Sequence, residues 1–159
     1  MHITYHKSCI KTHFAAELTQ QDLTVVTNDL SVPGAISTEL SSEIYVLGGR
    51  FRGGAQVTIG SVTASGVRIS VDSAIIGVGG ITAREGLTTT GLEEASMIAD
   101  MMAAARRTIV VADSSKLGKH SFAQIAPLRA MQVLVTDANP AAVLNAALRD
   151  CWVQMIVAE

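Results

Sequence analysis

The stretch Ile109-Val110-Val111-Ala112-Asp113-Ser114-Ser115-Lys116-Leu117-Gly118 decides the fold class, because its apolar half stops abruptly at an acid, two hydroxyls and a lysine. Four consecutive apolar residues, three of them β-branched, predict a strand that is buried on both faces, as in a parallel sheet. The Asp-Ser-Ser-Lys segment would then follow the carboxyl end of that strand, where open α/β sheets bind small molecules. A strand also ends in polar residues when it enters a solvated turn, so the segment alone is compatible with either interpretation.

Strands and helices are expected to alternate on both sides of this stretch. Apolar runs predict strands at residues 3–5, 23–27, 43–47, 71–80, 108–112, 132–136 and 153–157. Helical spacing and capping residues predict helices at 12–18, at about 33–40 after Ser31, near 61–67, at 92–106, and at 140–148 after Asn139. Residues 50–58 should form a loop or hairpin, 86–90 a polar loop and 120–123 a short edge segment. This order predicts a single α/β domain over residues 1–159, with a mostly parallel sheet and helices on both faces.

The composition restricts the classes of function. The chain has 159 residues, of which 48% are hydrophobic and 16% charged, so it can form a substantial core and is not a disordered segment. Its net charge is −2, whereas a domain that binds nucleic acid by neutralising phosphates should be basic. Any DNA-binding role is therefore expected to lie outside this chain.

Cysteine and histidine usage argues against disulfides and metal sites. Cys9 and Cys151 are too few for a disulfide framework, and we interpret them as reduced thiols. The four histidines lack the spacing of metal ligands, so no metal and no cofactor are expected. The amino-terminal residues do not resemble a signal peptide and no stretch approaches a membrane span, which predicts a cytoplasmic protein without a membrane partner.

The ends of the predicted strands supply small, hydroxylated and amide side chains, one lysine and few acids: Thr27, Asn28, Gly48, Gly49, Gly77, Gly79, Asp113, Ser114, Ser115 and Lys116. Such an edge suits a small polyhydroxylated or phosphorylated ligand. Hydroxyls and backbone N–H groups would bind its oxygens, glycines would leave room for it, and Lys116 would meet a phosphate. The glycines near Gly77 are equally compatible with a tight turn.

Several segments, taken in order, carry a resemblance to a known family: residues 23–30, 46–50, 76–81, 85–88, 93–95, 111–118, 126–128 and 135–137. Together they resemble the carboxy-terminal sensor domain of DeoR-family bacterial transcription regulators, and Ala-Asp-Ser-Ser-Lys-Leu-Gly at 112–118 is the most specific piece. The resemblance implies a fold shared with ribose-5-phosphate isomerases and CoA transferases, a phosphorylated sugar or related effector, and control of carbohydrate genes. It adds Glu94 to the candidate ligand-binding residues. It also implies an amino-terminal helix-turn-helix that this chain does not include, so the chain is expected to be an excised sensor domain or the product of a shortened gene.

Two departures from the family pattern affect the expected phosphate site. The family has an Asp-x-Gly-Thr-Thr-Thr loop after its first strand, and here His6-Lys7-Ser8-Cys9-Ile10-Lys11 takes that place. Ser8 and the lysines could still meet an anion, although the small residues that let backbone N–H groups surround a phosphate are gone. Met97 and Ile98 occupy the places of a Val-Lys pair in the family. Lys116 is therefore expected to be the main remaining cation of the pocket.

Three functions follow from these observations. The leading hypothesis is a non-catalytic effector-binding domain, which would act on DNA only through a separate domain. The second is a sugar-phosphate isomerase, for which Asp72, Asp113 or Glu94 would have to supply the carboxylate base. The third is an oligomerisation core that has lost its ligand. A homo-oligomer is expected for the effector-binding domain and for the oligomerisation core, because the absent amino-terminal elements would leave apolar surface uncovered.

Overall fold

The computed structural model describes residues 2–6, 19, 22–37, 43–62 and 68–158. Within them, one parallel sheet has seven strands in the order β12-β11-β9-β6-β1-β2-β3. The strands are β1 (His2–His6), β2 (Thr24–Thr27), β3 (Glu43–Val46), β6 (Val71–Gly77), β9 (Ala105–Val111), β11 (Val133–Thr136) and β12 (Gln154–Val157). Each neighbouring pair in this sheet is parallel. The predicted parallel sheet is therefore confirmed, and the opening stretch supplies its strand β9.

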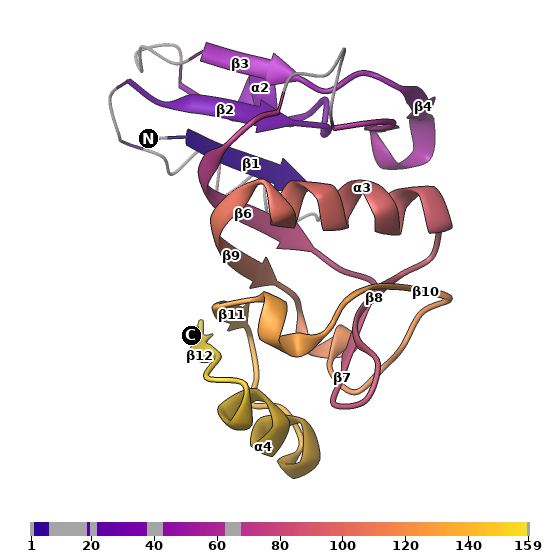
Figure 1. The fold of residues 1–159 in the computed structure, drawn as a ribbon, viewed down its shortest axis with the longest axis vertical. Helices are drawn as coiled ribbons and strands as arrows, with labels where there is room; N and C mark the ends of the chain where they lie inside the picture. The colour runs from indigo at the N-terminus through magenta and orange to yellow at the C-terminus, as the bar shows by residue number, and fades with distance from the viewer. Residues whose placement is uncertain (1, 7–18, 20–21, 38–42, 63–67, 159) are drawn as a thin grey trace.

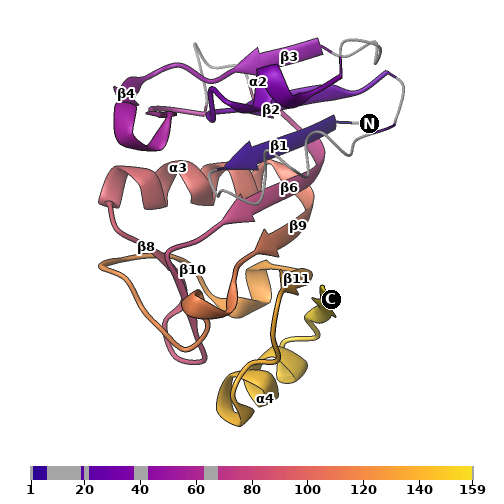
Figure 2. The same ribbon diagram turned by 180° about the vertical axis from the view of Figure 1, so that it is seen from behind.

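Helices cover both faces of this sheet, as predicted. Helix α3 (Leu92–Ala103) crosses one face in front of β6 in Figure 1, and the short helix α2 (Val32–Ala35) lies on the opposite face, which Figure 2 shows from behind. Helix α4 (Ala142–Asp150) packs beside β12 at one end of the sheet. The domain thus belongs to the α/β class.

The core consists of two clusters, one on each face of the sheet. In β6, Ala74 and Ile76 are fully buried against α3, whereas Ile75, between them, joins the cluster that includes Val32 of α2. Successive side chains of a strand point to opposite faces, so a strand between two layers must be apolar on both. This is the physical reason for the continuous apolar runs on which the fold prediction rested.

Two smaller antiparallel units stand outside the main sheet. A hairpin consists of β4 (Arg50–Arg52), the 3₁₀ turn η1 (Gly53–Ala55) and β5 (Val57–Ile59), so of the two predicted alternatives, loop or hairpin, the hairpin is the one found. A three-stranded sheet consists of β7 (Gly80–Thr82), β8 (Gly86–Thr89) and β10 (Ala123–Ala126). The remaining 3₁₀ turns are η2 (Ser114–Lys116) and η3 (Leu128–Ala130).

The prediction of a polar loop at residues 86–90 is wrong, because residues 86–89 form the central strand β8 of the small sheet. All four residues of β8 are buried. The threonines are compatible with burial because they are β-branched and their hydroxyls find partners, as Thr88 Oγ1 does by donating to the Gly80 carbonyl over 3.1 Å.

Other helix and strand boundaries differ from the prediction where strand pairing determines where an element begins or ends. Helix α3 ends at Ala103 instead of Arg106, because β9 begins at Ala105 and pairs there with Val71 of β6. The edge segment expected at 120–123 is found at 123–126 as β10, where it pairs with β8.

Capping residues were the weakest part of the prediction. Ser31 precedes α2 but its side chain makes no capping hydrogen bond, and α2 ends at Ala35 instead of continuing to about residue 40. Asn139 does not cap α4, which starts at Ala142. Ser61 and Val62 are not helical, and the rest of the 61–67 prediction, like the helix at 12–18, lies outside the described residues.

The order of the strands defines where a ligand should bind. From β1 the chain adds β2 and β3 on one side, and it then adds β6, β9, β11 and β12 on the other. The direction of winding therefore reverses between β1 and β6. In open α/β sheets, ligands bind at such a switch point, outside the carboxyl ends of the strands. His6 and Gly77, the last residues of β1 and β6, lie at this point, and the Asp-Ser-Ser-Lys turn follows the next strand, β9.

Candidate functional site

The Asp-Ser-Ser-Lys turn does lie at the carboxyl edge of the sheet, but its backbone N–H groups are already engaged. The Ser114 N–H donates to Asp137 Oδ1 over 2.6 Å and the Ser115 N–H to Asp113 Oδ1 over 2.9 Å. The Lys116 N–H donates to the Asp113 carbonyl over 2.9 Å. The expectation that these N–H groups bind an anion is therefore wrong. The Ser114 and Ser115 side chains are exposed and the Lys116 side chain is half-buried, so a ligand at this edge would meet these three side chains.

Asp137 is the functional candidate that sequence reasoning missed. It follows β11, which pairs with β9 in a register that sets Val135 opposite Val111 and so brings Asp137 beside the turn. Its second carboxylate oxygen lies 3.4 Å from the Ser114 hydroxyl. The signal was present, since an acid directly follows the next apolar run. Only the adjacency of β9 and β11 reveals its partner, and this makes Asp137 a positioning residue for the turn.

Asp113 is electrostatically adapted to this turn. Hydrogen bonding from Ser115, foremost from its side chain, lowers the pKa of Asp113 below its ordinary value of 3.8, and the charge of Lys116 adds to this effect against the opposing effect of burial. A carboxyl whose pKa is lower in the folded state stabilises the fold above its ordinary pKa, and this contribution disappears as the pH falls through the folded-state pKa.

We therefore expect the turn to loosen in acid. Asp113→Asn should make the domain less stable than the parent at pH 7, and the difference should shrink as the pH falls below the ordinary value of 3.8. Urea unfolding of both proteins at several pH values measures it. Asp150→Asn, a substitution of an exposed acid at the end of α4, is the control. A difference between Asp113→Asn and the parent that is independent of pH would contradict this assignment.

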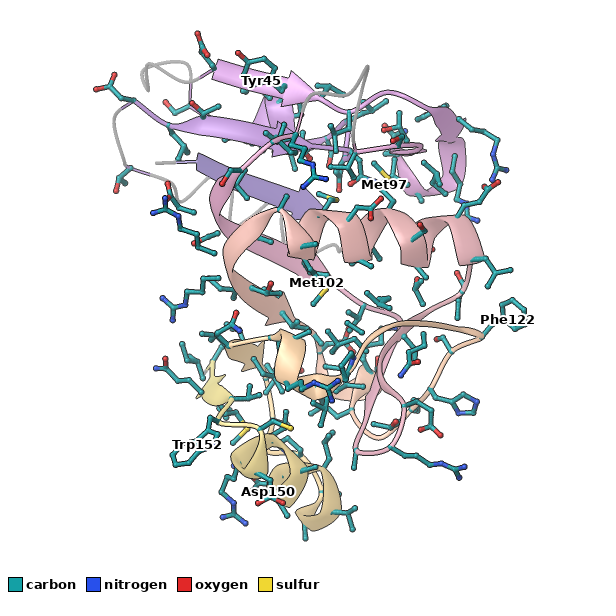
Figure 3. All side chains as sticks on the ribbon, viewed as in Figure 1. Tyr45, Met97, Met102, Phe122, Asp150 and Trp152 are labelled. Atoms are coloured by element: carbon teal, nitrogen blue, oxygen red, sulfur yellow. The ribbon has the colours of Figure 1, made fainter. Side chains whose placement is uncertain are left out.

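Thr27 and Asn28 are fully buried and serve mainly to hold the hairpin against the sheet. Asn28 Nδ2 donates to the Thr58 carbonyl over 2.8 Å and lies 3.8 Å from Met97 Sδ of α3. Figure 3 shows Met97 on the side of α3 that faces the hairpin. Thr27 Oγ1 accepts the Asp29 N–H over 3.0 Å. Asn28 Oδ1 has no hydrogen-bond partner in the described part of the chain, so it is the polar atom of this pair that a ligand could use.

Of the four glycines predicted to leave room for a ligand, two are packed closely against other protein atoms. A Cβ on Gly49, whose φ is +138°, would lie 2.6 Å from the Ile59 carbonyl carbon, and one on Gly79 would lie 2.7 Å from Ser121 Oγ. Neighbouring protein atoms fill that space, so for these two glycines the predicted role is wrong. Gly48 is exposed with nothing near its Cβ position, and Gly77 is the buried last residue of β6.

Glu94 is a buried carboxylate with two partners from other elements. Its side chain accepts the Thr89 hydroxyl over 3.0 Å, and Arg52 Nη1 of the hairpin lies 3.6 Å from the same oxygen. Its neighbour Glu93 is exposed and pairs with Arg50. Glu94 thus joins α3, β8 and the hairpin. Ser8, the remaining candidate, lies outside the described residues.

Three hollows in the surface of the described residues lie near these elements. An apolar groove of about 400 Å³ runs along β2 and β3 and includes Gly48. Two hollows of about 430 and 390 Å³ lie between the hairpin and α3, and the second includes Glu94. All three are within the ~300–1,000 Å³ range of small-molecule sites. The two beside α3 carry the charged side chains and lie towards the carboxyl edge, so we regard them as the better candidates.

The described ranges contain neither a metal site nor a membrane-spanning helix. No cluster of histidine, cysteine, aspartate or glutamate there could hold a metal ion. No helix among these residues is long and apolar enough to cross a membrane.

Comparison with known proteins decides the family. Residues 3–138 match the model of the DeoR C-terminal sensor domain. The chain belongs to this family. This DeoR sensor domain is 34% identical over 146 residues to the HTH-type transcriptional repressor GlcR of Bacillus subtilis, covering 91% of this chain and 56% of that protein. It is 30% identical over 143 residues to the repressor CsqR of Escherichia coli, with 89% and 55% covered.

A third relative of this DeoR sensor domain is the glycerol-3-phosphate regulon repressor of E. coli, which is 25% identical over 141 residues, with 88% of this chain and 56% of that protein covered. The chain spans about half the length of the curated relatives it matches. The predicted family is confirmed, and these three relatives are transcriptional repressors.

Proposed function

We propose that this DeoR sensor domain binds a phosphorylated sugar or a related small metabolite at the carboxyl edge of its sheet. The observation that carries the proposal is the position of the Asp-Ser-Ser-Lys turn, the most specific family segment, one strand away from the β1/β6 switch point. Lys116 and the hydroxyls of Ser114 and Ser115 would contact ligand oxygens. Asp113 and Asp137 hold the turn rigid for this purpose, which lowers the entropic cost of binding.

Binding would be coupled to DNA through a part of the regulator outside this chain. The relatives are HTH-type regulators, and one is a repressor of a glycerol-3-phosphate regulon, which supports both the coupling and the ligand class. An effector that binds more tightly to one conformation of a cytoplasmic homo-oligomeric regulator would shift the population towards it and change its affinity for DNA.

An isomerase is less well supported by the geometry. Asp72 lies near the amino end of β6, away from the switch point, where Arg106 Nη1 is 3.9 Å from its carboxylate. Asp113 has a lowered pKa, which makes it a weak base, and Glu94 already accepts the Thr89 hydroxyl. We propose that the domain is non-catalytic. Deuterium uptake into a sugar phosphate incubated with the domain in heavy water would contradict this.

The effector proposal is tested by thermal unfolding with a panel of phosphorylated sugars and glycerol 3-phosphate. At a hundredfold excess over its Kd, an effector adds about 2.7 kcal/mol of stability and should raise the melting temperature by several degrees. Lys116→Ala should reduce this rise. Lys119→Ala, which removes the same charge from an exposed position three residues along, should not. If no compound raises the melting temperature of the parent domain, the proposal loses its support.

A further inference from the structure

The cleft between the hairpin and α3 is divided by an ion pair. The hollows of about 430 and 390 Å³ share three lining residues, Arg50, Ile59 and Glu93. Arg50 Nη2 contacts Glu93 Oε2, so this pair stands where the two hollows meet. The side chains are 67% and 68% exposed, and such exposed pairs contribute only about 0–1 kcal/mol. The pair can therefore open at little cost, and the hollows would then form one cleft.

The hairpin directs two guanidinium groups to this cleft. Arg50 and Arg52 alternate along β4 and so share one face, and both have glutamate partners on α3. The second hollow is lined by both arginines, by the first residues of α3 and by Phe122. Phe122 is 78% exposed and projects beyond the amino-terminal end of α3 in Figure 3. The partial positive charge of a helix amino terminus also favours an anion there.

The Asp-Ser-Ser-Lys turn is a poorer place for a dianion. The turn offers a single lysine, its backbone N–H groups are engaged, and two of them are bound by the carboxylates of Asp113 and Asp137. Arginine binds phosphate oxygens in a bidentate manner, and two arginines on one strand exceed what one lysine offers. The cleft is therefore a better place than the turn for the anionic group of the effector.

We propose that the cleft between the β4–β5 hairpin and α3 is the anion-binding part of the effector site, and that it takes a phosphate monoester or a similar dianion. The anion displaces Glu93 from Arg50 and is held by Arg50 and Arg52. This assignment rests on the proposed function for the rest of the ligand. In this assignment the phosphate binds at the hairpin, and not at Lys116 as the sequence predicted.

Hydrogen bonds fix the hairpin to the end of β2, so that replacement of Glu93 by an anion at Arg50 would also affect the sheet. Leu30 N–H donates to the Gln56 carbonyl over 2.9 Å, and Asn28 and Thr58 bond to each other through backbone and side chain. An anion that pulls Arg50 away from Glu93 therefore acts on β4, whose partner strand β5 is joined to the segment that follows β2. Binding would change the surface that the hairpin presents to the rest of the regulator.

Inorganic phosphate is the probe that isolates this part of the site. We expect titration calorimetry at constant ionic strength to show saturable binding of phosphate to the parent domain, and Arg50→Gln to weaken it about tenfold, as loss of a charge-assisted contact does. Glu93→Gln removes the competing carboxylate and should tighten binding about threefold. This gain cannot arise from misfolding. Arg106→Gln, an exposed arginine paired with Asp72 near the amino end of β6, is the matched control and should change nothing.

The outcomes separate this inference from the proposed function. No saturable phosphate binding at millimolar concentrations, or equal affinity in the parent, Arg50→Gln and Glu93→Gln, overturns the anion site. So does weaker binding in Glu93→Gln. If a sugar phosphate still raises the melting temperature in those cases, with a smaller rise in Lys116→Ala, the effector proposal stands and the phosphate belongs at Lys116.

Discussion

Asn28→Asp should lower the stability of the domain by about 3–5 kcal/mol at pH 7, because it places an uncompensated charge in a fully buried position. Asn28 Nδ2 donates to the Thr58 carbonyl over 2.8 Å, and a carboxylate oxygen in its place would face that carbonyl without a proton. The loss corresponds to a fall in melting temperature of about 10 °C or more for a domain of this size. The hairpin should detach from β2 first.

The pH dependence identifies the cause of this loss. Burial disfavours the charged form of a carboxyl group, so stability should recover as the pH falls from 7 to 5 and the introduced group takes up a proton that it can donate to Thr58. Chemical unfolding at both pH values measures the effect. Asn139→Asp, at an exposed position before α4, should leave stability nearly unchanged. A small, pH-independent loss in Asn28→Asp would show that the site is open to water.

Gly80→Ala should lower the melting temperature by about 5–10 °C, the result of an overpacking cost of about 1–3 kcal/mol or somewhat more. An added Cβ would meet the backbone of Lys119, whose carbonyl carbon would lie 2.8 Å away, and would lie 3.2 Å from His120 Cα. Backbone atoms cannot rotate aside as a side chain can. The segment that follows the Asp-Ser-Ser-Lys turn would have to move away from β7. This movement would also break the hydrogen bond of 2.8 Å from the Gly118 N–H to the Ile81 carbonyl.

A second glycine supplies the control for this effect. Gly34 is exposed in α2, and a Cβ there would have nothing within 4 Å. Gly34→Ala should therefore preserve stability or raise it by about 0.4–1 kcal/mol, because alanine restricts the unfolded chain. Differential scanning calorimetry of both variants is the measurement. Equal melting temperatures for Gly80→Ala and the parent would show that residues 118–120 can move away from β7 freely.

Acidic residues shaped the site more than the sequence suggested. The residues at the predicted strand ends include few acids. In the structure, however, Asp137 follows β11 and bonds to the Asp-Ser-Ser-Lys turn, and Glu93 and Glu94 of α3 pair with the arginines of the hairpin. Sequence distance hid these pairs: Arg50 and Glu93 are 43 residues apart, and Ser114 and Asp137 are 23 apart. The Asp-Ser-Ser-Lys turn consequently contains one more carboxylate, Asp137, than its own sequence implies.

The amino-acid sequence alone predicts the class of the fold, the family and the edge of the sheet at which a ligand should bind. Continuous apolar runs such as Ile109 to Ala112 favour burial on both faces, and their alternation with helical segments predicts a parallel sheet between two helical layers. Tertiary structure decided the rest, because the site depends on which strands are neighbours. Pairing of β9 with β11 brings Asp137 to Ser114, and packing of the hairpin on α3 brings Arg50 to Glu93. Such contacts form between residues far apart in the chain, where local pattern carries no information about the partner.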